Sequence, residues 1–168
     1  MTSWQRFADE EPALAAAVRA RFEATKHHVL ATLRRDGSPR VSGTEVRIHG
    51  PELTLGSMVG AVKARDLQRD GRFALHANPG DGSMAGGDSK ISGRAIEIVD
   101  PAELKDYAEA TGTPSPDFHL FRLDLTEVVH TSVDEGQEYL LIQVWKPGVP
   151  LSRLARYNDG PELVRRLP

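Results

Sequence analysis

The hydrophobic positions near the N-terminus recur with a helical period. Leu14, Val18 and Phe22 are four residues apart, which places them on one face of a helix. The surrounding segment is rich in alanine, its acidic residues come first and its arginines come late, so its charges complement the helix dipole. The pattern predicts an amphipathic helix over residues 10–24.

From residue 28 the hydrophobic pattern becomes that of antiparallel strands. β-Branched residues stand on both sides of the Asp-Gly-Ser-Pro segment at residues 36–39, which is a strong hairpin signal. A second break, His-Gly-Pro-Glu at residues 49–52, is followed by the segment LTLGSM. We therefore expect residues 28–58 to form a three-stranded meander.

Two further helices are expected downstream. The first covers residues 60–70 and is expected to end at Gly71. The second follows Asp100, an N-cap residue, has Pro101 in its first turn and stops at Gly112. Both are short, so they are expected to flank a sheet and connect its strands.

The remaining segments are expected to be strands, a loop and a tail. The strands are expected at residues 72–78, 89–100, 118–133 and 138–148. Gly93 lies inside one of them and indicates a bulge or a close approach of two backbones. Residues 79–88 form a glycine-rich loop, a candidate lid over a ligand. Residues 149–168 are expected to be a less regular C-terminal tail.

Together these segments give about six strands, nearly all joined by hairpins or short helices. Closing such a sheet on itself removes its exposed edges, so a small barrel is favoured over an open sheet. The predicted fold is mainly β (α+β), a six-stranded antiparallel barrel with flanking short helices. Residues 1–168 are expected to form a single domain.

Composition and charge reduce the number of possible functions. The formal net charge is -3, which disfavours nucleic acid as a partner and makes a DNA-binding regulatory module unattractive. The chain has no cysteine, so disulfides, thiolate catalysis and cysteine-bound metals are excluded. None of the six histidines pair at the i, i+4 spacing of the common zinc motif, and no metal is predicted. No apolar run is long enough for a membrane span and no apolar signal core is present, so a cytoplasmic location is expected.

The segment GSMVGAVKARDL at residues 56–67 can bind a phosphate. Ser57 stands at a strand end, and Lys63 and Arg65 fall in the first turns of the helix that follows. A helix N-terminus offers unpaired N–H groups and partial positive charge, to which these side chains add a hydroxyl and two cations. The spacing fits neither a P-loop nor a dinucleotide fingerprint. The alternative is a solvated helix face with two basic residues.

The order of the motifs resembles the pyridoxamine 5'-phosphate oxidase-like superfamily, the flavin-binding split barrels. ATLRRDGSPRVS is similar to the opening hairpin of that family. GSMVGAVKARDLQRDGRFAL is similar to its stretch of Ser or Thr, six residues, Lys, helix and strand, with Gly71 where proline is usual. SGRAIEI is similar to its later glycine-containing strand. The resemblance spans roughly residues 25–148 and is specific as a series.

The resemblance implies a six-stranded split barrel that forms a homodimer with two cofactor sites at the interface. The cofactor would be FMN or, in some branches, a deazaflavin, and a small molecule would be the substrate. By position, Ser57 and Lys63 would hold the cofactor phosphate, with Arg65 as a neighbour.

The resemblance also implies contacts with the flavin ring. Residues 41–46 would line the isoalloxazine through their backbone and through Ser42 and Thr44, which face the same way on a strand. The alternative for these two is a polar outer strand face. Trp145 matches a tryptophan that contacts flavin across the dimer, and its alternative is plain burial.

The segment RLARY at residues 153–157 weakly resembles the substrate and cofactor segment of the oxidase. Arg156 would match an arginine that contacts the flavin. Ala155 stands where the oxidase has a histidine that grips the vitamin B6 phosphate. Pyridoxine or pyridoxamine phosphate is therefore not the expected substrate.

The function that follows is that of an FMN-binding oxidoreductase, with hydride transfer between the flavin and a small organic substrate. No acid–base pair of compelling spacing occurs, and hydride transfer needs no dedicated protein base. One alternative is a deazaflavin-dependent reductase on the same fold, for which Arg34, Arg35, Arg40 and Arg47 are available, unless they form a solvated hairpin face. The other is a non-enzymatic flavin- or haem-binding protein.

Overall fold

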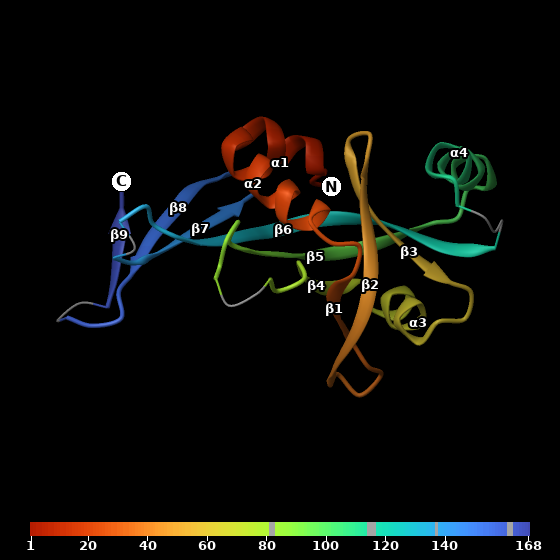
Figure 1. The fold of residues 1–168 in the computed structure, drawn as a ribbon. Helices are drawn as coiled ribbons and strands as arrows, with labels where there is room; N and C mark the ends of the chain where they lie inside the picture. The colour runs from red at the N-terminus through yellow and green to blue at the C-terminus, as the bar shows by residue number, and fades with distance from the viewer. Residues whose placement is uncertain (81–82, 114–116, 137, 161–162) are drawn as a thin grey trace.

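The computed structural model describes residues 1–80, 83–113, 117–136, 138–160 and 163–168 (Figure 1). The helices are α1 (Trp4–Glu10), α2 (Pro12–Glu23), α3 (Val62–Arg69) and α4 (Pro101–Thr111). The strands are β1 (His28–Leu33), β2 (Pro39–His49), β3 (Glu52–Met58), β4 (Arg72–His76), β5 (Asp88–Ile98), β6 (Phe118–Val133), β7 (Leu140–Lys146), β8 (Val149–Arg156) and β9 (Val164–Leu167). The predicted class, mainly β with short helices, is confirmed.

Six of the strands close into an antiparallel barrel. They follow the order β3-β2-β1-β4-β5-β6, and the pairing of β3 with β6 closes the ring. Alternate residues of these strands point inward and pack with α1 and α2. The fully buried members of this core include Leu30, Leu55, Leu75, Ile91, Phe121 and Leu123. The predicted six-stranded barrel is therefore confirmed.

Two glycines mark close backbone contacts at β5. The register between β5 and β6 shifts at Gly93, and a Cβ placed there would lie 2.0 Å from the Asp124 carbonyl oxygen. The predicted bulge and close approach both occur. At Gly71 an added Cβ would lie 2.6 Å from the Ala95 carbonyl oxygen. Gly71 therefore allows the backbone before β4 to approach β5 closely. The helix α3 ends before it, at Arg69.

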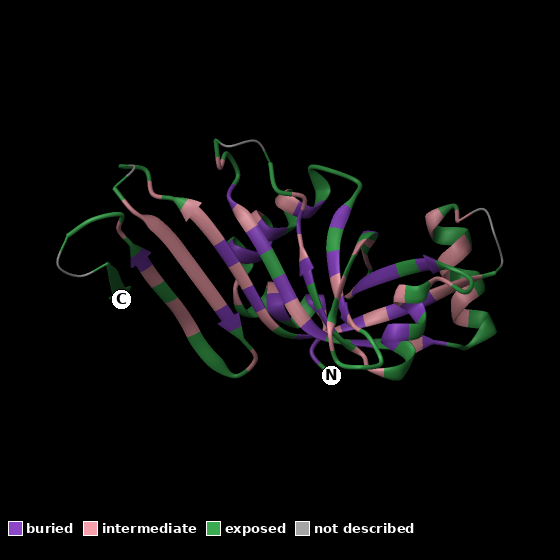
Figure 2. Cartoon of the chain, turned by 90° about the horizontal axis from the view of Figure 1, so that it is seen from below, coloured by how far each residue is buried: buried purple, intermediate pink, exposed green. Residues whose placement is uncertain are grey.

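The C-terminal segment, which was expected to be less regular, forms strands. β8 pairs with β7 over Leu140–Lys146, and β9 pairs with β8. With β7 they extend the sheet beyond the barrel from the second half of β6 (Figure 1). Residues 140–144 of β7 are all of intermediate burial, so this extension has no alternation of buried and exposed positions (Figure 2). β7 lies within the strand expected at residues 138–148, whereas β8 has mostly exposed and half-buried residues and carries little strand signal.

The N-terminal helices cover one side of the barrel. The predicted helix at residues 10–24 is α2, which spans Pro12–Glu23, and the additional helix α1 precedes it. Ser3 caps α1 by accepting a hydrogen bond from the Arg6 N–H, and Phe7 of α1 is completely buried. In the described part of the chain, no helix is both long and apolar enough to cross a membrane.

The helix α4 ends as predicted. The Asp100 side chain accepts a hydrogen bond from the Ala102 N–H at 3.0 Å, and Gly112 has a φ of 66° at the C-terminal end. None of the residues of α4 are buried. This helix therefore lies on the surface of the sheet as a connection between β5 and β6.

The buried histidine His28 holds the start of the glycine-rich loop. Its side chain is almost fully buried, and its Nδ1 accepts a hydrogen bond from the Asn78 N–H at 3.3 Å. Burial lowers the pKa of His28, the charges of His27 and Arg21 lower it further, and Glu45 opposes this. The neutral form is therefore favoured in the folded protein.

Acid is expected to destabilise the fold partly through His28. Unfolded histidine takes up a proton as the pH falls through about 6.5, whereas folded His28 resists protonation. The contribution of His28 to the free energy of unfolding is thus fully present above this pH. It is lost as the pH falls toward the lowered pKa of the folded state, by up to about 1.4 kcal/mol per pH unit. Urea unfolding at several pH values tests this. His28→Asn, which keeps an acceptor near the Nδ1 position, should flatten the dependence, and His27→Asn at the exposed neighbour should preserve it. Equal slopes in wild type and His28→Asn would contradict the assignment.

Candidate functional site

The turn between β3 and α3, residues 59–61, presents the backbone of a helix N-terminus. Ala61 occupies the N-cap position and offers no side-chain acceptor to the first-turn N–H groups of α3. Its own N–H donates to the Met58 carbonyl at 3.1 Å, and Gly60 has a φ of +73°, which a residue with a side chain rarely adopts. The turn therefore places uncapped N–H groups next to the end of β3.

Ser57 lies in β3 just before this turn. It is only 7% exposed, and its Oγ is buried without a hydrogen-bond partner among the described residues. Burying a hydroxyl without a partner is unfavourable, so this group is available to a ligand that reaches it. This orphaned hydroxyl fits the predicted role in phosphate binding.

Lys63 and Arg65 flank the same turn. The Lys63 Nζ donates to the Gly43 carbonyl at 2.6 Å, and burial lowers the pKa of Lys63, an effect that the nearby Glu45 carboxylate opposes. A Cβ placed on Gly60 would lie 3.7 Å from an Arg65 guanidinium nitrogen. In the described ranges of the chain, neither cation forms an ion pair with a carboxylate. Two unneutralised cations thus lie beside an uncapped helix end.

The two predicted wall residues face the inside of the barrel. Ser42 pairs with the fully buried Leu30 in the β1–β2 register, and Thr44 is itself buried. Val41 and Gly43 point the other way and are exposed. The structure brings this strand next to Lys63 through the Gly43 carbonyl, so the surface open to a ligand here consists of backbone, Val41 and Gly43.

A buried carboxylate holds α3 in place. Asp66 accepts hydrogen bonds from Arg40 at 2.6 Å, Thr32 at 3.0 Å and Arg69 at 3.1 Å. Burial raises the pKa of Asp66, but these hydrogen bonds outweigh it and lower the pKa overall. Arg40 therefore has a partner inside the chain and is not free to bind an acidic cofactor tail. No local sequence pattern marked Asp66, because Thr32 and Arg40 come from the opening hairpin.

His119 is a second residue that the sequence did not single out. Its Nδ1 lies 2.7 Å from the Glu97 carboxylate, and its Nε2 accepts a hydrogen bond from the Gly60 N–H at 3.4 Å. It is therefore in contact with the turn that carries the predicted phosphate site. Only the closure of the barrel brings these residues together, since His119 lies opposite Ser57 in the β3–β6 pair.

Two predicted residues lie away from the turn. The Trp145 side chain is 1% exposed, packs against Phe7 at 4.8 Å between ring centroids and donates from Nε1 to Glu10 at 2.9 Å. Arg156 is exposed in β8, where it pairs with Leu140. Within one chain, neither is brought to Lys63, and Trp145 has the burial that the alternative interpretation expected.

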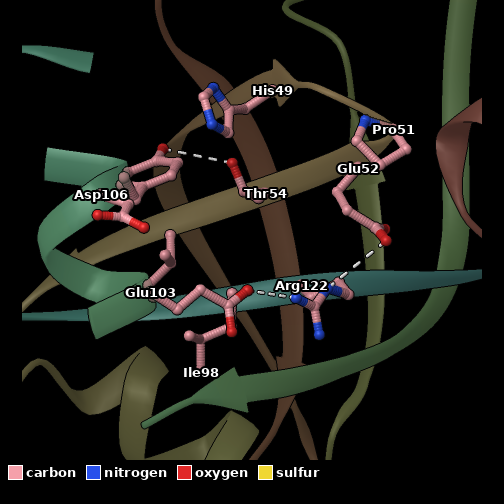
Figure 3. A pocket seen from close by; sticks show the side chains of 10 residues that line it. His49, Pro51, Glu52, Thr54, Ile98, Glu103, Asp106 and Arg122 are labelled. Atoms are coloured by element: carbon pink, nitrogen blue, oxygen red, sulfur yellow. Dashed lines mark hydrogen bonds and ion pairs between the residues drawn. The ribbon is translucent and has the colours of Figure 1, made fainter. Parts of the chain in front are cut away.

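A pocket lies between α4 and the outer face of β3 and β6 (Figure 3). It has a volume of about 270 Å³. Arg122 at its floor pairs with Glu52 at 3.6 Å and also with Glu103. Because these carboxylates neutralise the arginine, the pocket offers no free cation to a phosphate. Thr54, which also lines the pocket, lies on the opposite face of β3 from Ser57, so this pocket is separate from the β3–α3 turn.

The described residues of the glycine-rich loop lie against α2. A Cβ on Gly80 or Gly86 would lie 3.5 Å from the Arg21 side chain, which also donates to the Asn78 carbonyl at 2.5 Å. Residues 81–82 fall outside the described residues, and the role of this loop as a lid stays a prediction. In the ranges that the structure describes, no three His, Cys, Asp or Glu side chains are grouped as a metal site requires.

Solved structures share this fold at low sequence identity. A Clostridium acetobutylicum protein related to general stress protein 26 of B. subtilis, of the pyridoxinephosphate oxidase family, has a TM-score of 0.57 and 12% identity, and the match covers 77% of this chain and 91% of that one. General stress protein 26 from Bacillus anthracis has a TM-score of 0.55 and 12% identity, with 70% and 92% covered. A heme binding protein from Mycobacterium smegmatis has a TM-score of 0.50 and 22% identity, with 68% and 53% covered.

The family comparison is more specific than these structural matches. No curated protein matches the chain. The family model described as pyridoxamine 5'-phosphate oxidase matches residues 14–132, well over half of the chain. The matched range runs from α2 through β6 and contains the whole barrel and the β3–α3 turn. The chain therefore belongs to the pyridoxamine 5'-phosphate oxidase family.

Proposed function

We propose that the chain binds FMN and acts as a flavin-dependent oxidoreductase on a small organic molecule. The observation that carries this proposal is the β3–α3 turn. An uncapped helix N-terminus, the unpartnered Ser57 hydroxyl and the cations Lys63 and Arg65 meet there. This donor set suits a phosphate monoester dianion, because each group either lacks an acceptor or carries uncompensated positive charge.

Different residues near the turn would bind the phosphate and the ring of the cofactor. Ser57 and the α3 N–H groups would donate to the phosphate, and Lys63 would neutralise its charge. The exposed backbone face of β2 around Gly43 would lie along the ring, with Ser42 and Thr44 supporting it from inside the barrel. When bound, the flavin supplies hydride transfer, while the protein provides position and electrostatics.

The proposal includes a homodimer in the cytoplasm, with the cofactor at the interface. Exposed apolar side chains surround the turn and the adjacent strand, and such side chains suit contact with a partner. They are Val41, Met58, Val59 and Val62. Trp145 and Arg156 belong to the proposal as contacts across that dimer, and Trp145 would need α1 to move, because Phe7 and Glu10 cover it.

The substrate is proposed to differ from pyridoxamine phosphate. Ala155 is buried in β8, where the oxidase resemblance places a histidine that grips the substrate phosphate. A methyl group cannot donate to a phosphate, so this contact is missing. The substrate is therefore a small organic molecule that reaches the flavin without that grip.

A non-enzymatic haem-binding role is the second candidate. It is favoured by the structural similarity to the heme binding protein from Mycobacterium smegmatis. A deazaflavin is less favoured than FMN, because its acidic tail needs extra cations and Arg40 is already paired with Asp66.

An absorbance spectrum of the purified protein, with mass spectrometry of the released chromophore, tests the proposal. If the protein purifies without a chromophore, titration with FMN, a deazaflavin and haemin replaces the spectrum. Saturable FMN binding with flavin absorbance near 450 nm, roughly as for free flavin, is expected. Exclusive binding of haemin, with a Soret band, would instead establish the second candidate.

A further inference from the structure

The pocket between α4 and the sheet carries more negative charge than its arginine neutralises. Its lining includes the three carboxylates Glu52, Glu103 and Asp106 and one guanidinium, that of Arg122. Glu103 is in direct contact with the Nη2 of Arg122, so these two charges compensate each other. With the imidazole of His49 counted as neutral, three negative charges against one positive charge leave a net charge of -2 in the pocket.

The carboxylate of Glu52 is an acceptor that lacks a donor. Its Oε1 pairs with the Nε of Arg122, but the distance of 3.6 Å is too long for a hydrogen bond. Its Oε2 is buried and accepts no hydrogen bond from the described residues. Because the χ3 torsion of glutamate has a broad range, the carboxyl group can turn an oxygen toward a donor in the pocket. An N–H group that enters the pocket would thus relieve the cost of burying an unpaired acceptor.

The other walls of the pocket are apolar and aromatic (Figure 3). Ile98 and Leu120 line it as buried residues of β5 and β6. The ring of Tyr107 meets the imidazole of His49 edge to face, with 5.4 Å between the ring centroids. These side chains can cover the apolar body of a ligand, and an aromatic face also attracts a cation. The volume of about 270 Å³ lies just below the range of roughly 300–1,000 Å³ that is usual for ligand pockets, so the ligand is small.

The cation that suits this pocket is organic. Across the described parts of the chain, no group of three His, Cys, Asp or Glu side chains could hold a metal ion. An alkylammonium group needs no such group of ligands, because it binds through N–H donors and through the burial of its carbon atoms. An anion is disfavoured by the net negative charge of the lining.

We propose that this pocket is a second ligand site, which binds a small organic amine. The ammonium group donates to Glu52, Asp106 at the exposed rim adds negative potential, and the apolar body lies against Ile98 and Tyr107. The site is independent of the proposed flavin, because the pocket lies on the opposite face of β3 from Ser57.

NMR titration of the full-length, ¹⁵N-labelled protein with 2-phenylethylamine tests the site at about pH 7.5, where an alkylammonium group is charged. The amide signals of α4 and of residues 49–54 should shift and saturate, with a Kd on the order of 1 mM for a ligand of this size. The neutral isostere 2-phenylethanol should bind about tenfold more weakly, because it forms no charge-assisted hydrogen bond. The anion phenylacetate should not shift these signals.

Glu52→Gln should weaken the binding of 2-phenylethylamine by about tenfold, because it removes the charge of the acceptor and keeps its shape. Asp106→Asn at the exposed rim should weaken it by only about twofold. Glu109→Gln is the matched control. Glu109 lies on the same helix, its side chain is 68% exposed, and its ion-pair partner is Lys105 rather than a residue of the pocket. Its replacement should leave the affinity unchanged.

Selective binding of the amine that is weakened in Glu52→Gln and kept in Glu109→Gln establishes the site. Equal affinities for the amine and the alcohol, or for wild type and Glu52→Gln, overturn it, as does an absence of shifts at about 20 mM amine. If Glu52→Gln does not fold, the position of the shifts in wild type decides, because shifts confined to residues outside α4 and 49–54 place the amine elsewhere. A separate FMN titration tests the proposed function, and neither result determines the other.

Discussion

Replacing Lys63 by alanine is expected to weaken FMN binding by about 10- to 100-fold. A charge-assisted hydrogen bond to a phosphate contributes about 1.5–3 kcal/mol, which corresponds to this loss of affinity. Among the described residues, the substitution removes one hydrogen bond, from the Lys63 Nζ to the Gly43 carbonyl at 2.6 Å. The free energy of unfolding should therefore change by about 1 kcal/mol or less. Fluorescence titration of FMN into the chromophore-free protein measures the affinity.

The control for this experiment is Lys105→Ala. Lys105 is an exposed lysine of α4 whose neighbour is Glu109, one turn along the same helix. Its loss removes the same charge from the chain at a place remote from the turn, so affinity for FMN should be unchanged. If Lys63→Ala bound FMN as tightly as Lys105→Ala, Lys63 would not hold the phosphate.

Replacing Asp66 by alanine is expected to lower the free energy of unfolding by about 3 kcal/mol. The carboxylate is buried and accepts hydrogen bonds from Arg40, Arg69 and Thr32, so its removal leaves the guanidinium of Arg40 half-buried without a partner. Because these contacts tie α3 to β1 and β2, FMN binding should weaken as well. Urea unfolding monitored by tryptophan fluorescence measures the first effect, and FMN titration measures the second.

Asp70→Ala is the matched control. Asp70 directly follows α3, and hydrogen bonds from Arg72 lower its pKa to about 2. Its partner is exposed, so the loss of this pair should destabilise the protein far less than the loss of Asp66. Equal destabilisation by the two substitutions would show that Asp66 is an ordinary surface carboxylate in energetic terms.

The barrel could be predicted because its signals are local. The hairpin at residues 36–39, the caps of α4 at Asp100 and Gly112, and the strand glycine Gly93 each report on their own neighbourhood in the sequence. The strands β8 and β9 could not be predicted in this way. Their pairing with β7 depends on a sheet that already exists, and their residues do not alternate between buried and exposed positions.

The same distinction between local and long-range signals applies to the candidate site. Ser57, Lys63 and Arg65 lie within one short segment, so their spacing alone pointed to a phosphate. His119 was invisible in the sequence, because the register that places it opposite Ser57 joins strands that are far apart in the chain. Asp66 lies in α3 directly after Arg65, yet Arg40 and Thr32, two of its three hydrogen-bond partners, come from the opening hairpin, and so no local pattern marks it.

The strand β6 belongs to two parts of the sheet. Its first half closes the barrel against β3, and its second half begins the extension with β7. The match to the family ends at residue 132, almost at the last residue of this strand. Strands added or exchanged past that point leave the ring and its turn intact. The surface that β7, β8 and β9 present can thus change independently of the barrel that carries the turn.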